Sequence, residues 1–320
     1  MNKREEMTTE EIIKGATRFA DPFCITNGGG FRLKDVDPAD TLGLKSEHKP
    51  RASEALALGV RALAELQEKL YAQDRWAVLL IFQAMDAAGK DTAIKHVMSG
   101  VNPAGCQVYS FKAPSSEDLD HDYLWRCMKC LPERGRIGIF NRSYYEETLV
   151  VRVRPELLEK QKLPHELVND QIWKGRFKDI RNFERYLTRN GTVVRKFFLY
   201  VSKEEQRRQF LERLDDPEKT WKLSDRDAEE RKHWENYMSA YEETIRHTAT
   251  KFAPWYVVPA DNRWFTRLVV AAALLGALAS LDLSYPKVCE QQPEKIAAVR
   301  AALMAEDAGQ AQEERMAVPG

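Results

Sequence analysis

Five short apolar segments recur along the chain, each rich in β-branched or aromatic residues. Stretches with apolar positions at helical spacing separate them, so the pattern alternates strands with helices. This alternation predicts a parallel β-sheet with helices on both faces, and continuously apolar strands agree with burial on both sides. The five predicted strands are AVLLIF (77–82), CQVYSF (106–111), RIGIF (136–140), VVRKFFLYV (193–201) and WYVVP (255–259).

The segments around these strands predict the remaining organisation. Residues 52–73 and 262–280 carry helical patterns, and residues 203–250 form a highly charged helical insertion. The first fifty residues are polar and irregular, with a glycine loop at 28–30, and predict an arm lying on a core. We therefore expect an arm over 1–50, a main domain over 51–290 and a tail over 291–320, helical or frayed.

Composition describes an ordinary globular chain. Of 320 residues, 43% are hydrophobic, which is ample for a core, and the 49 basic residues balance 49 acidic ones. A nucleic-acid binder usually has a basic excess, so we expect no nucleic-acid partner. Zero net charge still allows a local basic channel for an anionic substrate.

Targeting and membrane signals are weak. The first residues are charged and contain no apolar signal-peptide core, and the longest apolar run, 268–279, is too short to span a bilayer. We expect a cytoplasmic protein that does not enter membranes.

The cysteines do not indicate a disulfide framework, because their number, five, is odd. Cys127 and Cys130 form a C-x-x-C pair in a predicted helix without a second pair at zinc spacing. We expect structural thiols, with redox or metal use as the alternative.

The segment after the first strand has the layout of a phosphate-binding loop. Strand, small-residue turn, Gly-Lys and helix follow one another, so backbone N–H groups and a helix N-terminus would face an anion. The pattern is imperfect, because Ala84 replaces the first glycine of G-x-x-x-x-G-K. The predicted phosphate-binding residues are Ala87, Ala88, Gly89, Lys90, Asp91 and Thr92.

One acid, Asp86, lies inside this loop. A carboxylate in a phosphate cradle repels its ligand unless a cation intervenes, which makes Asp86 a candidate Mg²⁺ ligand. A local loop contact of its side chain is the alternative.

A second polar cluster, Asn141-Arg142, follows the third predicted strand. Ligands bind at the carboxyl ends of strands in such sheets, and an arginine there suits a planar clamp on phosphate. Asn141 stands where phosphate-loop enzymes usually carry an acid. Glu146 and Glu147, further on, could face metal or nucleotide, but a solvated or helix-capping role is the favoured interpretation for each.

Three long motifs together make the chain resemble the polyphosphate kinase 2 family. The resemblance runs from about residue 31 to about residue 281 and is closest to the third class, which accepts both AMP and ADP. Ala84 and Asn141 are normal for that class, whereas Thr92 stands where members commonly carry glycine. The motifs are FQAMDAAGKDTAIKHVMSGVNPAG, FKAPSSEDLDHDYLWRCMKCLPERGRIGIFNRSYYEETLVVRV and RLDDPEKTWKLSDRD.

The resemblance implies a P-loop kinase fold of the thymidylate kinase type. This is a three-layer α/β/α arrangement with a five-stranded parallel sheet and a helical lid at about 203–226. It also implies a homo-oligomer, a dimer or a tetramer. The implied substrates are inorganic polyphosphate and the adenine nucleotides AMP, ADP and ATP, with Mg²⁺ as cofactor and Mn²⁺ as an alternative.

The same resemblance implies residue roles. Asp86 holds the metal and Lys90 binds the transferring phosphate, while Arg126 and Arg142 clamp phosphates. Lys112 contacts polyphosphate or nucleotide phosphate. The lid contributes Lys222 and either Arg208 or Arg213, of which Arg213 fits the family pattern better.

The implied reaction is a reversible, direct in-line transfer to ADP or AMP without a phosphoenzyme, so His96 and His121 are bystanders. Two rival interpretations are an ATP-dependent nucleoside monophosphate kinase of the same fold and a noncatalytic polyanion or nucleotide binder.

Overall fold

The computed structural model describes residues 8–218, 225–287 and 295–305. The chain divides into two compact units, Met1–Ser284 and Tyr285–Gly320, and the described part of the second unit is helical over 295–305. No helix in the described ranges has the length and apolar character that a bilayer span requires.

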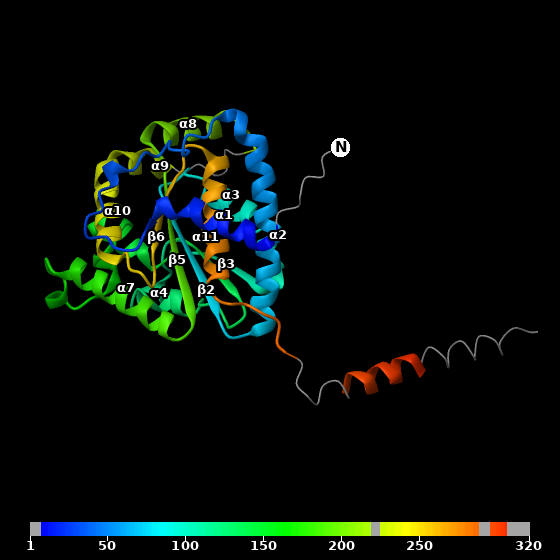
Figure 1. Ribbon diagram of the computed structural model, residues 1–320. Coiled ribbons are helices and arrows are strands. Elements are labelled where there is room, and N and C mark those ends of the chain that lie inside the picture. The colour runs from blue at the N-terminus through cyan, green and yellow to red at the C-terminus, as the bar shows by residue number, and fades with distance from the viewer. Residues whose placement is uncertain (1–7, 219–224, 288–294, 306–320) are drawn as a thin grey trace, which may run out of the picture. The chain divides into compact units, whose positions relative to one another are not determined.

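Parallel strands form the centre of the first unit, as the alternation of elements predicts (Figure 1). The sheet order is β1-β6-β5-β2-β4-β3. The strands are β1 Cys24–Ile25, β2 Ala77–Ala84, β3 Cys106–Ser110, β4 Ile137–Asn141, β5 Thr192–Tyr200 and β6 Trp255–Pro259.

The predicted number of strands, five, is wrong, because the sheet has six strands in the described residues. The five predicted segments pair in parallel, and β1 adds to β6 antiparallel. Only two residues of β1 pair, which is too short a run to leave a periodic signal in the sequence.

Helices cover both faces of the sheet. Figure 1 shows α11 against one face, where it packs with α1, α2 and α3, while α7 and α10 pack together on the other. The helices are α1 Thr9–Ala20, α2 Lys49–Gln73, α3 Lys90–Val97, α4 Ser116–Leu119, α5 Trp125–Met128, α6 Val150–Val153, α7 Ile172–Arg189, α8 Lys203–Leu214, α9 Asp225–Glu230, α10 Trp234–Thr248 and α11 Arg263–Ala279.

The arm is not irregular throughout, which corrects the prediction for residues 9–20. The Thr8 side chain caps the Glu11 N–H and Glu11 returns the contact, so a capping box starts α1. The ring of Phe19 then packs on Phe265 of α11, 5.5 Å between centroids. The sequence contained signals for this helix that the prediction did not use, namely the capping box and the helical spacing of Ile12, Ala16 and Phe19.

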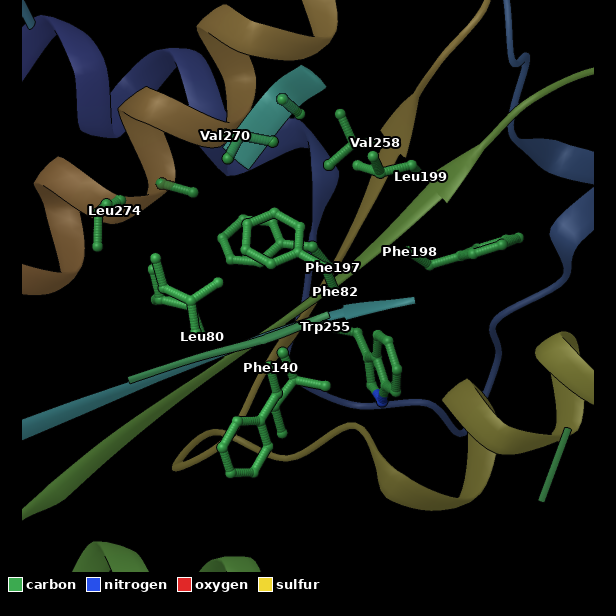
Figure 2. Close-up of a cluster of buried hydrophobic side chains, with 14 of the residues drawn as sticks. Leu80, Phe82, Phe140, Phe197, Phe198, Leu199, Trp255, Val258, Val270 and Leu274 are labelled. Atoms are coloured by element: carbon green, nitrogen blue, oxygen red, sulfur yellow. The ribbon is translucent and has the colours of Figure 1, made fainter. Parts of the chain in front are cut away.

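The core lies on both sides of the central strands (Figure 2). Phe82 of β2 and Phe197 of β5 are paired in register and stack at 4.8 Å, toward Val270 of α11. Phe198 points to the other side and stacks on Tyr241 of α10. This two-sided burial holds the carboxyl end of β2, and therefore the loop after it, on a rigid base.

A buried polar network holds the turn after β4. Lys196 Nζ on β5 donates to Glu184 Oε2 at 2.6 Å, to Tyr145 OH at 3.0 Å and to the Thr248 carbonyl at 2.8 Å. The Tyr144 hydroxyl also donates to Glu184. Because each buried charge has partners, the network ties α7, β5 and α10 to the segment that carries Glu146.

Candidate active site

The site lies where the sheet order changes direction. The chain leaves β2 for β3 and β4 on one side and then returns past β2 to β5 and β6, so the carboxyl ends of β2 and β4 border a crevice. Ligands bind at this point in open α/β sheets. Asp86 and Lys90 follow the end of β2, Asn141 is the last residue of β4 and Arg142 follows it.

The loop from Ala84 to Lys90 has the backbone of a phosphate cradle. Ala87 and Gly89 both have positive φ, 66° and 89°, which turns the chain tightly before α3 begins at Lys90. Gly89 adopts this left-handed conformation without a Cβ penalty. The N–H groups at the start of α3 therefore point into the crevice with the positive end of the helix dipole.

Lys90 is buried and folds back over the loop, where Nζ donates to the Ala84 carbonyl at 3.0 Å. Burial lowers the pKa of its ammonium, and the nearby Asp86 carboxylate opposes that effect. A phosphate in the cradle would stabilise the charged form in the same way.

Asp86 and Arg142 contact each other across the crevice. Arg142 Nη2 donates to Asp86 Oδ1 at 2.8 Å, and both side chains are about two-fifths exposed. The Arg142 backbone has φ 64° and its N–H donates to the Phe82 carbonyl, so the turn directs the side chain back over β2. Glu146 first and Asp86 second raise the pKa of the Arg142 guanidinium.

Asn141 and Asp91 form a second contact between the two strand ends. Asn141 Nδ2 donates to Asp91 Oδ1 at 2.6 Å. The uncharged amide thus orients the loop carboxylate, which an acid at position 141 would repel.

Glu146 and Glu147, whose roles the sequence left open, have separate environments. Glu146 is mostly buried beside the site, 4.0 Å from Arg142, and accepts at 2.8 Å from Gln83 when that amide is oriented to satisfy Ser143 as well. Burial raises the pKa of Glu146, and Arg142, Lys90 and Arg126 oppose the rise.

Glu147 instead turns away from the crevice. It pairs with buried Arg176 of α7 and also accepts from Gln161 at 2.8 Å. Both glutamate side chains are mostly buried, so the solvated role favoured from the sequence is wrong for both, although both lie in the first turn of the 3-10 helix at 144–147.

Arg126 approaches the site from α5. Its Nη1 donates to the Lys112 carbonyl at 2.8 Å, and the guanidinium lies 5.6 Å from the centre of the Phe111 ring. Arg126 is one of the cations that oppose the rise in the pKa of Glu146. The Lys112 side chain is exposed beside it.

Of the three predicted lid residues, the structure describes two, Arg208 and Arg213. Arg208 is exposed on α8 and pairs with Glu205 at 2.6 Å and with Glu212. Arg213 lies over the Phe210 ring, 5.6 Å from its centre, at the last turn of α8. Lys222 lies outside the described residues.

Two glutamines of α8, missed in the sequence, connect this helix to the site. Gln206 Nε2 donates to the Asp86 carbonyl at 2.9 Å, and Gln209 accepts from Arg263 at the start of α11. Arg263 had a usable signal, because it follows the predicted strand at 255–259. The glutamines had none, since only the packing of α8 brings them to the loop.

The acids present fit a magnesium ion held in part by its substrates. The described residues contain no cluster of three or more metal-ligating side chains, as an all-protein cage requires. Mg²⁺ needs less, because it usually binds through one or two carboxylates, waters and substrate phosphates. The half-exposed carboxylate of Asp86, inside a phosphate loop, has the chemistry and the accessibility that such a ligand needs.

Sheet order, phosphate loop and strand-end arginine together define a P-loop kinase fold. The model of the family described as polyphosphate kinase 2 (PPK2) matches residues 46–285. The chain belongs to the polyphosphate kinase 2 family, as the motifs predict, and the family consists of phosphate-transferring enzymes.

Several relatives are similar over most of their length. The chain is 50% identical over 259 residues to an ADP-polyphosphate phosphotransferase of Rhodopseudomonas palustris, covering 81% of this chain and 90% of that one. It is 46% identical over 268 residues to an AMP/ADP-polyphosphate phosphotransferase of Meiothermus ruber, covering 84% and 96%. The crystal structure of polyphosphate kinase 2 from Arthrobacter aurescens TC1 aligns with a TM-score of 0.78 at 39% identity, over 88% of this chain and 96% of that one.

Proposed function

We propose that this enzyme transfers the terminal phosphate of inorganic polyphosphate to ADP, giving ATP, and to AMP, giving ADP. The observation that carries the proposal is the acid inside the phosphate loop, Asp86, paired with Arg142 at 2.8 Å above a buried Lys90. The names of the two relatives, one for ADP and one for both nucleotides, support the same acceptors.

Charge neutralisation is the main task of such a site. Donor and acceptor are both polyanions, and two unit charges about 4 Å apart repel by about 4 kcal/mol at an effective dielectric of about 20. Lys90, Arg142 and Arg126 lower that repulsion from three sides, and backbone N–H groups of the loop hold the transferring phosphate. Two further cations expected from the lid, Arg213 and Lys222, would add positive charge.

Asp86 would hold Mg²⁺, with Mn²⁺ as a substitute, beside Lys90 and Asp91. When bound, the ion neutralises phosphate oxygens of donor and acceptor and orients them. Arg142 then clamps phosphate in place of its pairing with Asp86, so binding exchanges one ion pair for two charge-assisted contacts.

Transfer is direct and in line, and the same groups serve the reverse direction. A terminal phosphate oxygen of the nucleotide forms the new P–O bond while the bond to the polyphosphate chain breaks, leaving a chain shorter by one unit. The two histidines have local roles, since the His96 ring contacts the Thr92 carbonyl and the His121 ring stacks on Trp125. No residue of the crevice is a phosphate-accepting histidine or serine in this proposal.

A nucleoside monophosphate kinase that uses ATP as donor would share the fold, but the names of the relatives do not favour it. A cytoplasmic location and a dimeric or tetrameric assembly stay predictions.

Nucleotide analysis tests the proposal. The protein is mixed with Mg²⁺, long-chain polyphosphate and ADP or AMP, without ATP. We expect ATP from ADP, and ADP followed by ATP from AMP. Transfer only when ATP is supplied with a nucleoside monophosphate would overturn it.

A further inference from the structure

Gln206 of α8 is an almost completely buried amide, 1% exposed, with a hydrogen-bond partner at each end. Its Nε2 donates to the Asp86 carbonyl at 2.9 Å, and its Oε1 accepts from Arg231 Nη1 at 2.6 Å. These partners fix the orientation of the amide, because only its nitrogen can donate to a carbonyl and only its oxygen can accept from a guanidinium. Gln206 therefore joins the phosphate loop to the 3-10 turn that follows α9.

The carbonyl that Gln206 holds belongs to the central peptide of a tight turn. The Ala88 N–H donates to the Met85 carbonyl at 3.3 Å, which closes a four-residue turn. Within this turn Asp86 has a negative φ, whereas Ala87 has a φ of 66°. A negative φ followed by a positive φ at the two central positions defines a type II turn.

A type II turn differs from a type I turn by rotation of its central peptide through about half a turn. The type I form would suit alanine better, because the positive φ of the type II form favours glycine and is unfavourable for a residue with a Cβ. The hydrogen bond from Gln206 opposes this rotation, since a rotated Asp86 carbonyl would point away from the amide. Gln206 thus holds the turn in the form that Ala87 disfavours.

The orientation of this peptide decides where the Ala87 N–H points. The peptide is trans, so its N–H and its carbonyl point in opposite directions. Because the carbonyl faces α8, outside the loop, the N–H faces the inside of the loop. Among the described residues this N–H has no hydrogen-bond partner, so it is available to a phosphate oxygen. A rotated peptide would present the carbonyl oxygen to the phosphate instead and repel it.

Arg231 holds the glutamine in place. The same Nη1 that donates to Gln206 also donates to the Lys203 carbonyl at 3.0 Å, at the start of α8. The residue before it, Glu230, accepts from Arg154 Nη2 at 2.9 Å, which ties this part of the chain to the end of α6. The amide of Gln206 therefore has a fixed support behind it, as a residue that positions another group requires.

We propose that Gln206 is a positioning residue for the phosphate loop, which keeps the Ala87 N–H directed at the phosphate being transferred. The inference rests on the proposed function, because it needs a phosphate in the cradle. Gln206 contacts no substrate and acts through the backbone of the loop. Preorganised N–H donors act on the charge that spreads over the phosphate oxygens in the transition state, so the effect falls mainly on kcat.

The test compares wild type with Gln206→Met, which has a similar length and cannot donate to the Asp86 carbonyl. A second variant, Gln206→Glu, can still pair with Arg231 but has no donor when ionised, and it serves if Gln206→Met fails to fold. We expect kcat with polyphosphate and ADP to fall at least about tenfold in both, because one preorganised donor is lost. The KM values for ADP and polyphosphate should stay within about threefold.

Ala87→Gly supplies a readout that a purely structural role of Gln206 would not change. Glycine adopts a positive φ without a Cβ penalty, so the type II form no longer needs to be held from α8. Adding Ala87→Gly to Gln206→Met should therefore raise kcat at least about threefold above that of Gln206→Met alone. Ala87→Gly by itself is measured as the reference for the double variant.

Gln67→Met is the matched control. Gln67 is a glutamine of α2 with the same exposure of 1%, and its Nε2 packs on Gly105 just before β3. Because β3 and β4 are parallel, the start of β3 lies at the edge of the sheet opposite the carboxyl ends that border the crevice. The control should keep the wild-type kcat. Melting temperatures of all variants identify any that fail to fold.

The outcomes separate the two claims. If the wild type transfers no phosphate from polyphosphate, the proposed function fails. The positioning role is wrong, and the proposed function stands, if the wild type transfers phosphate but the folded Gln206 variants keep kcat within about twofold. The same conclusion follows if they lose no more activity than Gln67→Met, or if Ala87→Gly restores none of the loss.

Discussion

Asp86 Oδ1 lies 2.8 Å from Arg142 Nη2, so the acid of the phosphate loop and the arginine that ends β4 neutralise each other across the crevice. Both side chains are only half-buried, and exposed pairs of this kind contribute about 0–1 kcal/mol to stability. Breaking this ion pair therefore costs the protein little stability. In the proposed function, Arg142 turns to substrate phosphate and Asp86 to a metal ion without a large loss of stability.

Replacing Asp86 should lower the activity of the enzyme without lowering its stability. We expect Asp86→Asn to lower kcat by about 10³-fold, as loss of an electrostatic contact to the transition state does, with an unchanged melting temperature. Steady-state rates at saturating Mg²⁺ and a thermal melt measure both. Glu133→Gln, which breaks an exposed 2.8 Å pair with Arg136 just before β4, is the control and should be neutral. A near-native rate for Asp86→Asn would make the loop assignment untenable.

Gly89 allows a test of the loop's backbone. Its φ of 89° lies in the left-handed region, where a side chain costs about 1–2 kcal/mol. Gly89→Ala should lose this stability and most activity, because the N–H groups of the cradle turn away. Gly43→Ala, with φ 77° and open space around its Cβ, should lose similar stability but keep its activity. Denaturant unfolding and turnover of both variants are compared, and equal activity loss would contradict the cradle.

The buried Lys196–Glu184 pair predicts a large effect on folding. Lys196→Met leaves an unpaired carboxylate at a site with no exposure, and we expect a loss of about 3–5 kcal/mol. Adding Glu184→Gln should restore part of it, since the amide oxygen still accepts from Tyr144 and Tyr145. Urea unfolding measures the stability of both variants. If Lys196→Met alone were as stable as wild type, the pair would not be buried in solution.

The lid arginines can be told apart by their partners. Arg208 is held by Glu205 and Glu212 on an exposed helix face, whereas Arg213 rests on the Phe210 ring near the described end of the lid. We expect Arg213→Ala to reduce turnover at least about tenfold and Arg208→Ala to leave it within about twofold. If Arg208→Ala instead reduced turnover more than Arg213→Ala, Arg208 would be the lid arginine that acts on the substrate.

Cys127, the first thiol of the C-x-x-C pair, should be unreactive toward thiol reagents in the folded protein. Cys127 is completely buried, and burial raises the pKa of its thiol to about 12. A neutral, buried thiol is a poor nucleophile, so a maleimide at neutral pH should modify Cys127 only after unfolding. Peptide mass spectrometry measures the modification, with native and denatured samples compared. Rapid labelling of Cys127 in the native protein would contradict the structural interpretation.

Sequence patterns predicted the parts of the fold that repeat a period. The apolar segments located all five parallel strands, and helical spacing located α2 and α11. The loop residues Asp86 and Lys90 and the strand-end Arg142 were found because their positions after strands have a chemical meaning.

Contacts made by packing alone were beyond the sequence. β1 pairs through only two residues. The contact of Gln206 with the Asp86 carbonyl depends on how α8 approaches the loop. No local pattern contains that information, since it joins residues far apart in the chain.

Product analysis without ATP tests the central claim most directly. Purified protein is incubated with long-chain polyphosphate, Mg²⁺ and ADP or AMP, and the nucleotides are separated over time, with Asp86→Asn and a chelator as blanks. The account predicts ATP from ADP and stepwise ADP and ATP from AMP, both lost in the blanks. No phosphate transfer from polyphosphate, together with transfer from ATP to a nucleoside monophosphate, would contradict it.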